Sequence, residues 1–323
     1  MIKNQKIEIA HPKNQLCLFG YDAYFKSFVK LFEKEEMPHC VLLSGSKGLG
    51  KSTFIYHFIN YLFSKAEKNS YSINDLIINK ENLSYKLLNA NTHPNFFLIE
   101  NNNFEKDVKI EKVRNLLKFL NRSTYSKDLK IVMIDNIENF NLNSANALLK
   151  SLEEPRNNTF FFIIHNNRCQ ILNTIKSRCI EFKIFFSESS KRSIFKKIVE
   201  QYDGEFESDF LLKDLHFDTP GNLIKYLLFF KIQNVDLYTN KLSVISYLIE
   251  SYKNEKNYEV LNYLLLFVEK FFNGLCLNDP KNFNINFFNY IRILKLLNYM
   301  KKFNLDEKNS LILIEDILKN EKR

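Results

Sequence analysis

Two kinds of hydrophobic pattern divide the chain near residue 187. Before this point, short apolar runs alternate with segments whose apolar residues recur at helical spacing, and after it only the helical spacing is found. Short apolar runs that alternate with amphipathic helices are typical of a parallel sheet covered by helices on both faces. The pattern therefore predicts an α/β fold that is followed by helices alone.

Short apolar runs predict five strands, at residues 40–44, 94–100, 130–135, 159–165 and 179–185. The run "TFFFIIH" at 159–165 is apolar throughout, as expected for a strand that is buried on both faces of a sheet. Apolar residues spaced by three and four predict helices at 52–64, 110–122, 143–155, 188–201, 207–213, 220–232, 240–251 and 256–273, with further helix to the end.

The same change of pattern predicts how the chain divides into domains. A length of 323 residues exceeds the usual size of one domain. We expect an α/β domain over 1–186, a small helical domain over 187–235 and a helical domain over 236–323. The most apolar helical segments, "LIKYLLFFKI" and "YLLLFVEKFF", carry lysines and fall short of a membrane span, so we interpret them as core faces of helices.

Composition excludes some classes of protein and favours others. The net charge of +9 favours anionic partners such as nucleic acid or nucleotide phosphates, although a solvated lysine-rich surface gives the same charge. The polar N-terminus lacks the apolar segment of a signal peptide. The cysteines are scattered without a CxxC pair, which argues against a disulfide framework or a cysteine zinc site and fits a reducing cytoplasm: Cys17, Cys40, Cys169, Cys179 and Cys276.

A complete phosphate-loop motif lies between the first predicted strand and the helix that follows it. The segment "GSKGLGKST" fits the pattern G-x-x-x-x-G-K-[ST] with Gly45, Ser46, Lys47, Gly48, Leu49, Gly50, Lys51, Ser52 and Thr53. The backbone N–H groups of such a loop surround phosphates, and the start of the helix adds partial positive charge. We expect Lys51 to reach the β- and γ-phosphates and Ser52 to bind Mg²⁺.

The strand "KIVMID" ends in an acid that fits the second position of a magnesium site. This acid is Asp135, and the residue after it is Asn136, which can orient a water molecule but cannot accept its proton. Glu138 lies past the strand end, and we expect it on a solvated turn. The phosphate loop and the strand that ends in Asp135 together predict binding of ATP and Mg²⁺, and they leave open whether ATP is hydrolysed.

A longer stretch resembles a known family. The segment "NSANALLKSLEEPRNNTFFFIIHNNRCQILNTIKSRC" is similar to the signature stretch of bacterial DNA polymerase III clamp-loader subunits, which are AAA+ ATPases. The segments "LFGYD", "MPHCVLLSG" and "HPNFFLIE" agree with it, so that the resemblance covers most of residues 11–186. It implies an AAA+ nucleotide-binding domain, a small helical lid domain and a helical collar that holds a hetero-oligomer together.

Among these subunits the chain is most similar to the delta-prime type. The gamma/tau motor subunits carry a four-cysteine zinc module after the phosphate loop, whereas residues 52–134 contain no cysteine, so no zinc is expected. The motors also have a glutamate where this chain has Asn136. A family arginine that senses the γ-phosphate is missing, because Ile224 takes its expected position and the adjacent residue is Lys225.

The resemblance implies roles for two further residues. Asn166, next to His165, aligns with the family's first sensor, although an asparagine at a strand end can equally be a loop residue. Arg178 of the "SRC" motif would reach into a neighbouring subunit's ATP site and neutralise charge during phosphoryl transfer, or else lie in a surface salt bridge. Cys179 beside it is expected to pack as a small buried hydrophobe.

The function that the resemblance implies is that of a delta-prime-like component of the DNA polymerase III holoenzyme in the cytoplasm. Its partners would be the delta and gamma/tau subunits, and the complex would place the sliding clamp on primed DNA. Its own ATPase activity is expected to be weak or absent. Three alternatives stay open: a gamma/tau-type motor that uses Glu138 as base, a P-loop small-molecule kinase, and a DNA-binding adaptor. The kinase would explain the phosphate loop but not the stretch from Asn143 to Cys179.

Overall fold

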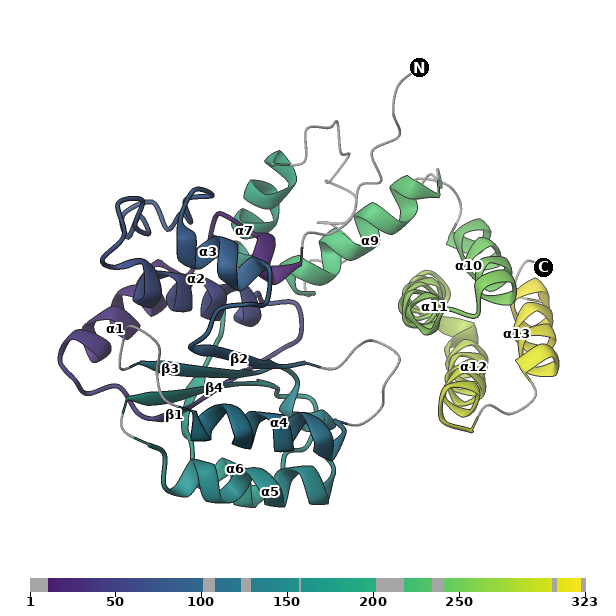
Figure 1. Ribbon diagram of the computed structural model, residues 1–323. Helices are drawn as coiled ribbons and strands as arrows, with labels where there is room; N and C mark the ends of the chain where they lie inside the picture. The colour runs from purple at the N-terminus through teal and green to yellow at the C-terminus, as the bar shows by residue number, and fades with distance from the viewer. Residues whose placement is uncertain are drawn as a thin grey trace. The chain divides into compact units, whose positions relative to one another are not determined.

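The computed structural model describes residues 11–100, 108–122, 129–156, 158–201, 218–233, 241–303 and 307–320 (Figure 1). The described residues fall into two compact units. The first contains the sheet and ends at Lys225, and the second comprises the helices from Tyr226 onward. The division into three domains that the sequence predicts is not tested by these two units and stays a prediction.

A parallel sheet of five strands forms the centre of the first unit. Its neighbours lie in the order β2-β3-β4-β1-β5, and every pair is parallel. The strands are β1 Cys40–Gly45, β2 Phe96–Ile99, β3 Lys130–Ile134, β4 Thr159–Asn166 and β5 Ile180–Lys183. All five predicted strands are confirmed, with ends that differ from the prediction by one or two residues.

Helices cover both faces of this sheet, which is why its central strands are apolar throughout. On one face α1 and α2 pack on Val41, Leu43 and Phe162, and on the other α4 and α5 pack on Leu42 and Phe161 (Figure 1). The helices and 3-10 turns of this unit are η1 Pro12–Asn14, α1 Asp22–Glu33, α2 Lys51–Ser64, α3 Leu83–Asn89, α4 Ile110–Asn121, η2 Ile137–Asn139, α5 Leu142–Glu153, α6 Asn173–Lys176 and α7 Glu188–Glu200.

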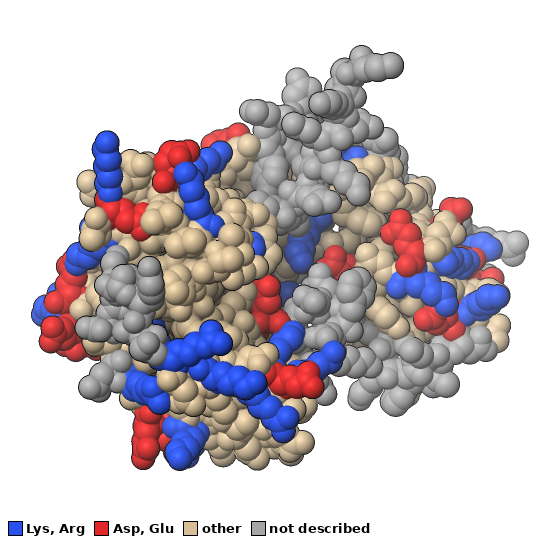
Figure 2. All heavy atoms as spheres, in the orientation of Figure 1, with Lys and Arg blue, Asp and Glu red and all other residues tan. Residues whose placement is uncertain are grey.

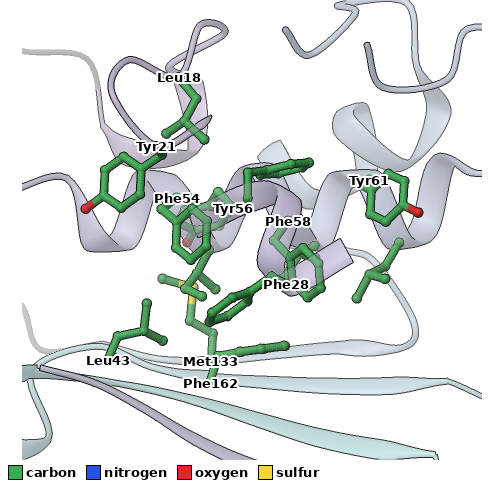
Figure 3. Close-up of a cluster of buried hydrophobic side chains, with 14 of the residues drawn as sticks. Leu18, Tyr21, Phe28, Leu43, Phe54, Tyr56, Phe58, Tyr61, Met133 and Phe162 are labelled. Carbon is green, nitrogen blue, oxygen red and sulfur yellow. The ribbon is translucent and has the colours of Figure 1, made fainter. Parts of the chain in front are cut away.

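Aromatic side chains fix α2 above the sheet (Figure 3). The Phe54 ring stacks on Tyr21 with 4.8 Å between centroids and meets Phe28 edge-on at 4.9 Å. Phe58, one turn later, packs edge-on against Phe162 of β4 at 5.7 Å. Because α2 begins at the end of the phosphate loop, this packing also fixes the position of the loop.

The second unit is a bundle of helices around its own core. It contains the later part of α9 Pro220–Ile232, then α10 Lys241–Glu255, α11 Tyr258–Asn278, η3 Pro280–Asn282, α12 Phe283–Phe303 and α13 Glu307–Asn320. The helices predicted over 220–232, 240–251 and 256–273 are confirmed, and the one predicted over 207–213 lies outside the described residues.

The length of the helix α11 corrects the expectation that the apolar segment "YLLLFVEKFF" falls short of a membrane span. The helix extends beyond the run seen in the sequence, and of the described helices it alone is long and apolar enough to cross a membrane. Its apolar side chains nevertheless lie in the helical core: Val260, Leu261, Tyr263, Leu264, Phe267, Val268, Phe271 and Phe272 are buried. The interpretation as the core face of a helix is therefore confirmed.

Candidate functional site

The register of the parallel strands brings the predicted site residues to one edge of the sheet. Gly45, the last residue of β1, pairs with Asn166, the last residue of β4. Ile134 of β3 pairs with Ile163 of β4, so Asp135 follows directly at the same edge. The carboxyl ends of parallel strands are where ligands bind in open α/β sheets.

The phosphate loop has the predicted strand–loop–helix geometry. β1 ends at Gly45, and α2 begins at Lys51. Gly48 and Gly50 have φ angles of +85° and +86°, which a residue with a Cβ adopts only under strain. The glycine positions of the motif are therefore explained by the backbone, while binding of nucleotide stays a prediction.

Lys51 lies folded over its own loop. Its Nζ donates hydrogen bonds to Gly45 O at 2.7 Å and to Ser46 O at 2.8 Å, and the residue is buried. Burial lowers the pKa of Lys51 to about 8, against the opposing charges of Asp135 and Glu138. The partners of the Lys51 ammonium group are thus two backbone oxygens. Phosphate oxygens would form stronger hydrogen bonds with it, because they are charged.

Ser52 and Asp135 form the predicted pair for Mg²⁺. Ser52 Oγ donates to Asp135 Oδ2 at 2.8 Å. Burial raises the pKa of Asp135, while the Ser52 hydroxyl and the Lys51 charge lower it. In the described part of the chain, no group of three or more His, Cys, Asp or Glu is placed to hold a metal. Two oxygen ligands completed by phosphates and water are nevertheless what Mg²⁺ requires.

The turn after β3 corrects the expectation for Glu138. Asn136 adopts a left-handed conformation with φ +59°, and the 3-10 turn η2 follows it. Glu138 in this turn is partly buried, and its Oε2 accepts a hydrogen bond from Asn166 N at 3.3 Å. Because the turn folds back toward β4, the carboxylate lies close enough to Lys51 and Asp135 to shift their pKa values. The predicted turn is confirmed, but Glu138 is only partly exposed to solvent and is hydrogen-bonded to β4.

The sensor candidate Asn166 faces the same site, whereas His165 faces another cavity. The Asn166 side chain accepts from Arg168 N at 3.3 Å and donates to Cys169 Sγ at 3.6 Å. His165 is buried, its Nε2 lies 3.0 Å from Cys169 O, and it lines a separate cavity beside Ser44. This division follows from alternation along β4, since neighbouring side chains point to opposite faces.

A cavity of about 400 Å³ connects these groups. It is polar at the phosphate loop and apolar where Leu18, Ile194 and Ile198 line it, a combination that suits a nucleotide's phosphates and base. Ile224 and Lys225 also line it, so the position expected for the missing arginine does lie at the site. The lining that carries polar chemistry comprises Lys47 to Thr53, Glu100, Asp135, Asn136, Asn166, Asn222 and His11.

Glu100 is a site residue that the sequence prediction missed. It follows β2, and the pairing of Ile99 with Ile134 places it beside Asp135 at the sheet edge. Its Oε2 lies 3.5 Å from Nε2 of His11, whose hydrogen bond lowers the pKa of Glu100. The signal was available, because "FFLIE" ends in an acid just as "KIVMID" does. The sequence does not show that these two strands are neighbours in the sheet.

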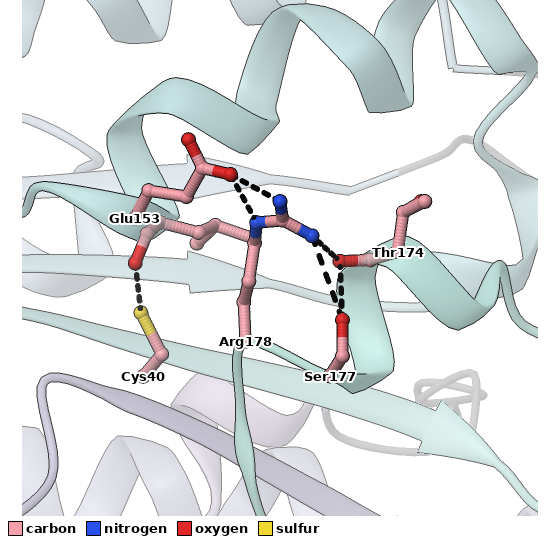
Figure 4. A network of polar contacts seen from close by, with 6 residues as sticks. Cys40, Glu153, Thr174, Ser177 and Arg178 are labelled. Carbon is pink, nitrogen blue, oxygen red and sulfur yellow. Dashed lines mark hydrogen bonds and ion pairs between the residues drawn. The ribbon is translucent and has the colours of Figure 1, made fainter.

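Arg178 is partly exposed and does not line this cavity. Its guanidinium pairs with Glu153, with Nε donating to Oε1 at 2.7 Å and Nη2 bonded to the same oxygen (Figure 4). Nη1 donates to Thr174 O at 2.7 Å. In the single chain, Arg178 therefore forms a surface salt bridge, and its role toward a neighbour stays a prediction. Cys179 is partly buried, and burial raises its pKa to about 11.

Comparison with known proteins identifies relatives for the first unit. The model of the family described as "DNA polymerase III, delta subunit" matches residues 20–187. "DNA polymerase III subunit delta'" of Pseudomonas aeruginosa is 34% identical over 148 residues, 46% of this chain and 43% of that protein. The protein of the same name from Escherichia coli is 26% identical over 155 residues, 48% of this chain and 45% of that protein.

Two further matches carry other names. "DNA polymerase III subunit gamma" of Buchnera aphidicola is 26% identical over 201 residues, 62% of this chain and 53% of that protein. The chain spans about half the length of the curated relatives it matches. Among solved structures, a gamma subunit-related protein from Thermotoga maritima has a TM-score of 0.42 at 17% identity, covering 91% of each chain.

Proposed function

Because the chain belongs to the DNA polymerase III delta-subunit family, we propose that it is a delta-prime-like subunit of a bacterial clamp loader. In this role it assembles with delta and gamma/tau subunits in the cytoplasm, and the complex places the sliding clamp on primed DNA. The relatives named delta' support the assignment. The match from residue 20 to 187 is the observation that carries it.

The first unit is proposed to bind ATP with Mg²⁺. Lys51 would exchange its bonds to Gly45 O and Ser46 O for phosphate oxygens, and Ser52 with Asp135 would hold the metal. Bound Mg²⁺ would neutralise part of the phosphate charge. Hydrolysis is expected to be weak, because Asn136 follows Asp135 and Ile224 stands where an arginine would sense the γ-phosphate.

The arginine of the "SRC" motif is proposed to act in a neighbouring subunit's ATP site. Arg178 supports this role because its guanidinium is partly exposed and is held by a surface pair with Glu153, which is a weak interaction in water. A phosphate oxyanion in a neighbour's site would attract the same guanidinium more strongly, since it carries more charge and offers bidentate contacts.

One observation favours a second candidate, an ATP-hydrolysing subunit of the gamma/tau type. The Glu138 carboxylate bonds to the backbone of the sensor strand and acts electrostatically on Lys51. A general base for hydrolysis must lie within reach of a water near the γ-phosphate. Glu138 is displaced from the usual strand-end position by the turn, so we rank this function second.

Basic residues on the first unit suit contact with DNA in the assembled complex. Lys and Arg side chains gather on the face of this unit drawn in Figure 2, over α4 and α5. These two helices pack together and expose Arg114, Lys118 and Lys150. Phosphate contacts made by such residues carry no sequence preference, which is what primed DNA of any sequence requires.

The test is ATP turnover by the complex reconstituted with delta, gamma/tau, clamp and primed DNA. Arg178→Ala should abolish most of the turnover, Lys51→Ala should change it little, and Arg192→Ala, an exposed arginine on α7, serves as the control. If Lys51→Ala removes a share like that of a motor subunit, the second candidate is correct. Failure of the wild-type chain to join the complex would refute the clamp-loader assignment itself.

A further inference from the structure

The start of α9 packs directly on the phosphate loop, although 172 residues separate the two segments in sequence. Thr219 Oγ1 donates to Lys47 O at 2.8 Å, and Gly221 N donates to Gly48 O at 2.9 Å. Two consecutive carbonyl groups of the loop are thus bound by one short segment. We call Asp218–Asn222 the α9 clasp.

The clasp determines the direction of the loop's N–H groups. A trans peptide group points its C=O and N–H in opposite directions, and the described chain contains no cis peptide. The peptides that carry Lys47 O and Gly48 O therefore point the N–H groups of Gly48 and Leu49 away from the clasp. Neither N–H donates to another backbone group of the described residues. Both remain available for an anion, as a phosphate-binding loop requires.

Glycine is required on both sides of this contact. A Cβ added at Gly221 would lie 2.7 Å from Gly48 O and 3.0 Å from Gly48 Cα, closer than side chains approach backbone. Gly48 already has a positive φ, and a Cβ there would collide with Thr219 Oγ1. The close approach of the two backbones therefore depends on this glycine pair.

Asp218 stabilises the conformation of the clasp by accepting hydrogen bonds from two of its residues. Its Oδ1 accepts hydrogen bonds from Thr219 N at 2.7 Å and from Asn222 Nδ2 at 2.8 Å. Asp218 and Thr219 are both buried. A buried, hydrogen-bonded carboxylate at a helix start is stabilised by the helix dipole, so the Thr219 hydroxyl is presented in a fixed direction.

We propose that Thr219 and Gly221 are positioning residues that hold the phosphate loop in its anion-binding conformation before nucleotide arrives. The inference rests on the proposed nucleotide binding and extends it. Where the family's sensing arginine is absent, the start of α9 acts on the loop through hydrogen bonds to its carbonyl groups instead of through a charge. Loss of either clasp contact should therefore weaken nucleotide binding without removing any group that touches the phosphates.

The test compares variants by affinity for a fluorescent ATP analogue with Mg²⁺ and, without nucleotide, by hydrogen exchange of the residue 221 N–H, which donates to Gly48 O. Thr219→Val and Gly221→Ala should weaken binding at least about fivefold, the effect of one lost hydrogen bond, and should speed the exchange of this N–H. Thr219→Ser keeps the hydroxyl, and Gly274→Ala changes an α11 glycine with no atom within 4 Å of the added Cβ. Both controls should behave like the wild type.

Unchanged exchange of the residue 221 N–H in Thr219→Val and Gly221→Ala would refute the positioning role, whatever the affinities. Faster exchange with wild-type affinity would also overturn it, because the loop would then not need the clasp to bind nucleotide. If the wild-type chain binds no nucleotide, the proposed nucleotide site fails, and the positioning role fails with it. In that case faster exchange would still show that the contact orders the loop, so the two failures are distinguishable.

Discussion

At the scale of single residues, Lys51 should make stability depend on pH. Its pKa is about 8 in the folded chain and near 10.5 when unfolded, so between these values the unfolded state binds more protons. Stability should therefore rise with pH from 8 to 10.5, by at most ~1.4 kcal/mol per pH unit. Below pH 8 the buried charge is fully destabilising, and Lys51→Met should be the more stable protein by about 2–3 kcal/mol.

Urea unfolding between pH 7 and 10 measures this effect as the difference between wild type and Lys51→Met, in which other titrations cancel. The exposed lysine of the same loop, Lys47, provides the control as Lys47→Met. A difference between wild type and Lys51→Met that is constant over this pH range would contradict the lowered pKa of Lys51. Nucleotide affinity should fall above pH 8 for the same reason, since the neutral amine no longer attracts phosphate.

A second residue-scale prediction concerns the metal. Ser52→Ala removes the hydroxyl that bonds to Asp135 Oδ2, while Thr53→Ala removes the neighbouring hydroxyl and is the control. In a titration with a fluorescent ATP analogue, Mg²⁺ should strengthen binding to wild type and to Thr53→Ala but not to Ser52→Ala. The lost bond should also lower stability by about 1 kcal/mol. An undiminished effect of Mg²⁺ on Ser52→Ala would remove Ser52 from the site.

The residues that the sequence could and could not reveal differ in a physical way. Lys51, Ser52 and Asp135 belong to local motifs, so their chemistry is readable from neighbours along the chain. Glu100 and Thr219 act through residues far away in sequence, and only the strand order and the fold bring them to the site. Glu138 lies on the expected turn but is less exposed than expected, because the left-handed Asn136 directs the turn toward β4, which residue type alone did not reveal.

At the scale of elements, the packing of α2 should decide both stability and the site. Phe54 is fully buried between Tyr21 and Phe28, so Phe54→Ala should lower the free energy of unfolding by about 3–5 kcal/mol. Phe54→Leu, which keeps most of the apolar volume, should lose much less. Urea denaturation of the two variants measures this. Equal losses would mean that the site is not packed as described.

Element prediction succeeded where hydrophobic pattern and burial coincide. The strands β1, β3 and β4 are mostly apolar because helices cover both faces, so their runs stand out in the sequence, whereas the edge strand β5 carries Glu181 and Lys183 and is only partly buried. The helices α1 and α3 were missed, although α1 has the spacing of an amphipathic helix, with Phe25 and Phe28 buried on one face. α3 is only seven residues long, and a short helix shows too few turns for a period to be recognised.

At the scale of the whole molecule, the partner that the Arg178 guanidinium binds depends on whether a second subunit is present. In the single chain Glu153 holds the guanidinium, and an exposed pair of this kind contributes at most about 1 kcal/mol. To enter a neighbour's ATP site, Arg178 must leave this pair. Glu153 therefore competes with the neighbour's phosphate for the same guanidinium.

Glu153→Gln should remove that competition. In the reconstituted complex we expect ATP turnover to stay equal or to rise, by at most about fivefold, because the competing pair contributes no more than about 1 kcal/mol. The matched change Glu154→Gln, at the next position along the chain, should have no effect. If Glu153→Gln instead abolishes turnover as Arg178→Ala is expected to, then Glu153 orients the arginine for the neighbour. The salt bridge of the single chain would then be the working conformation rather than a resting one.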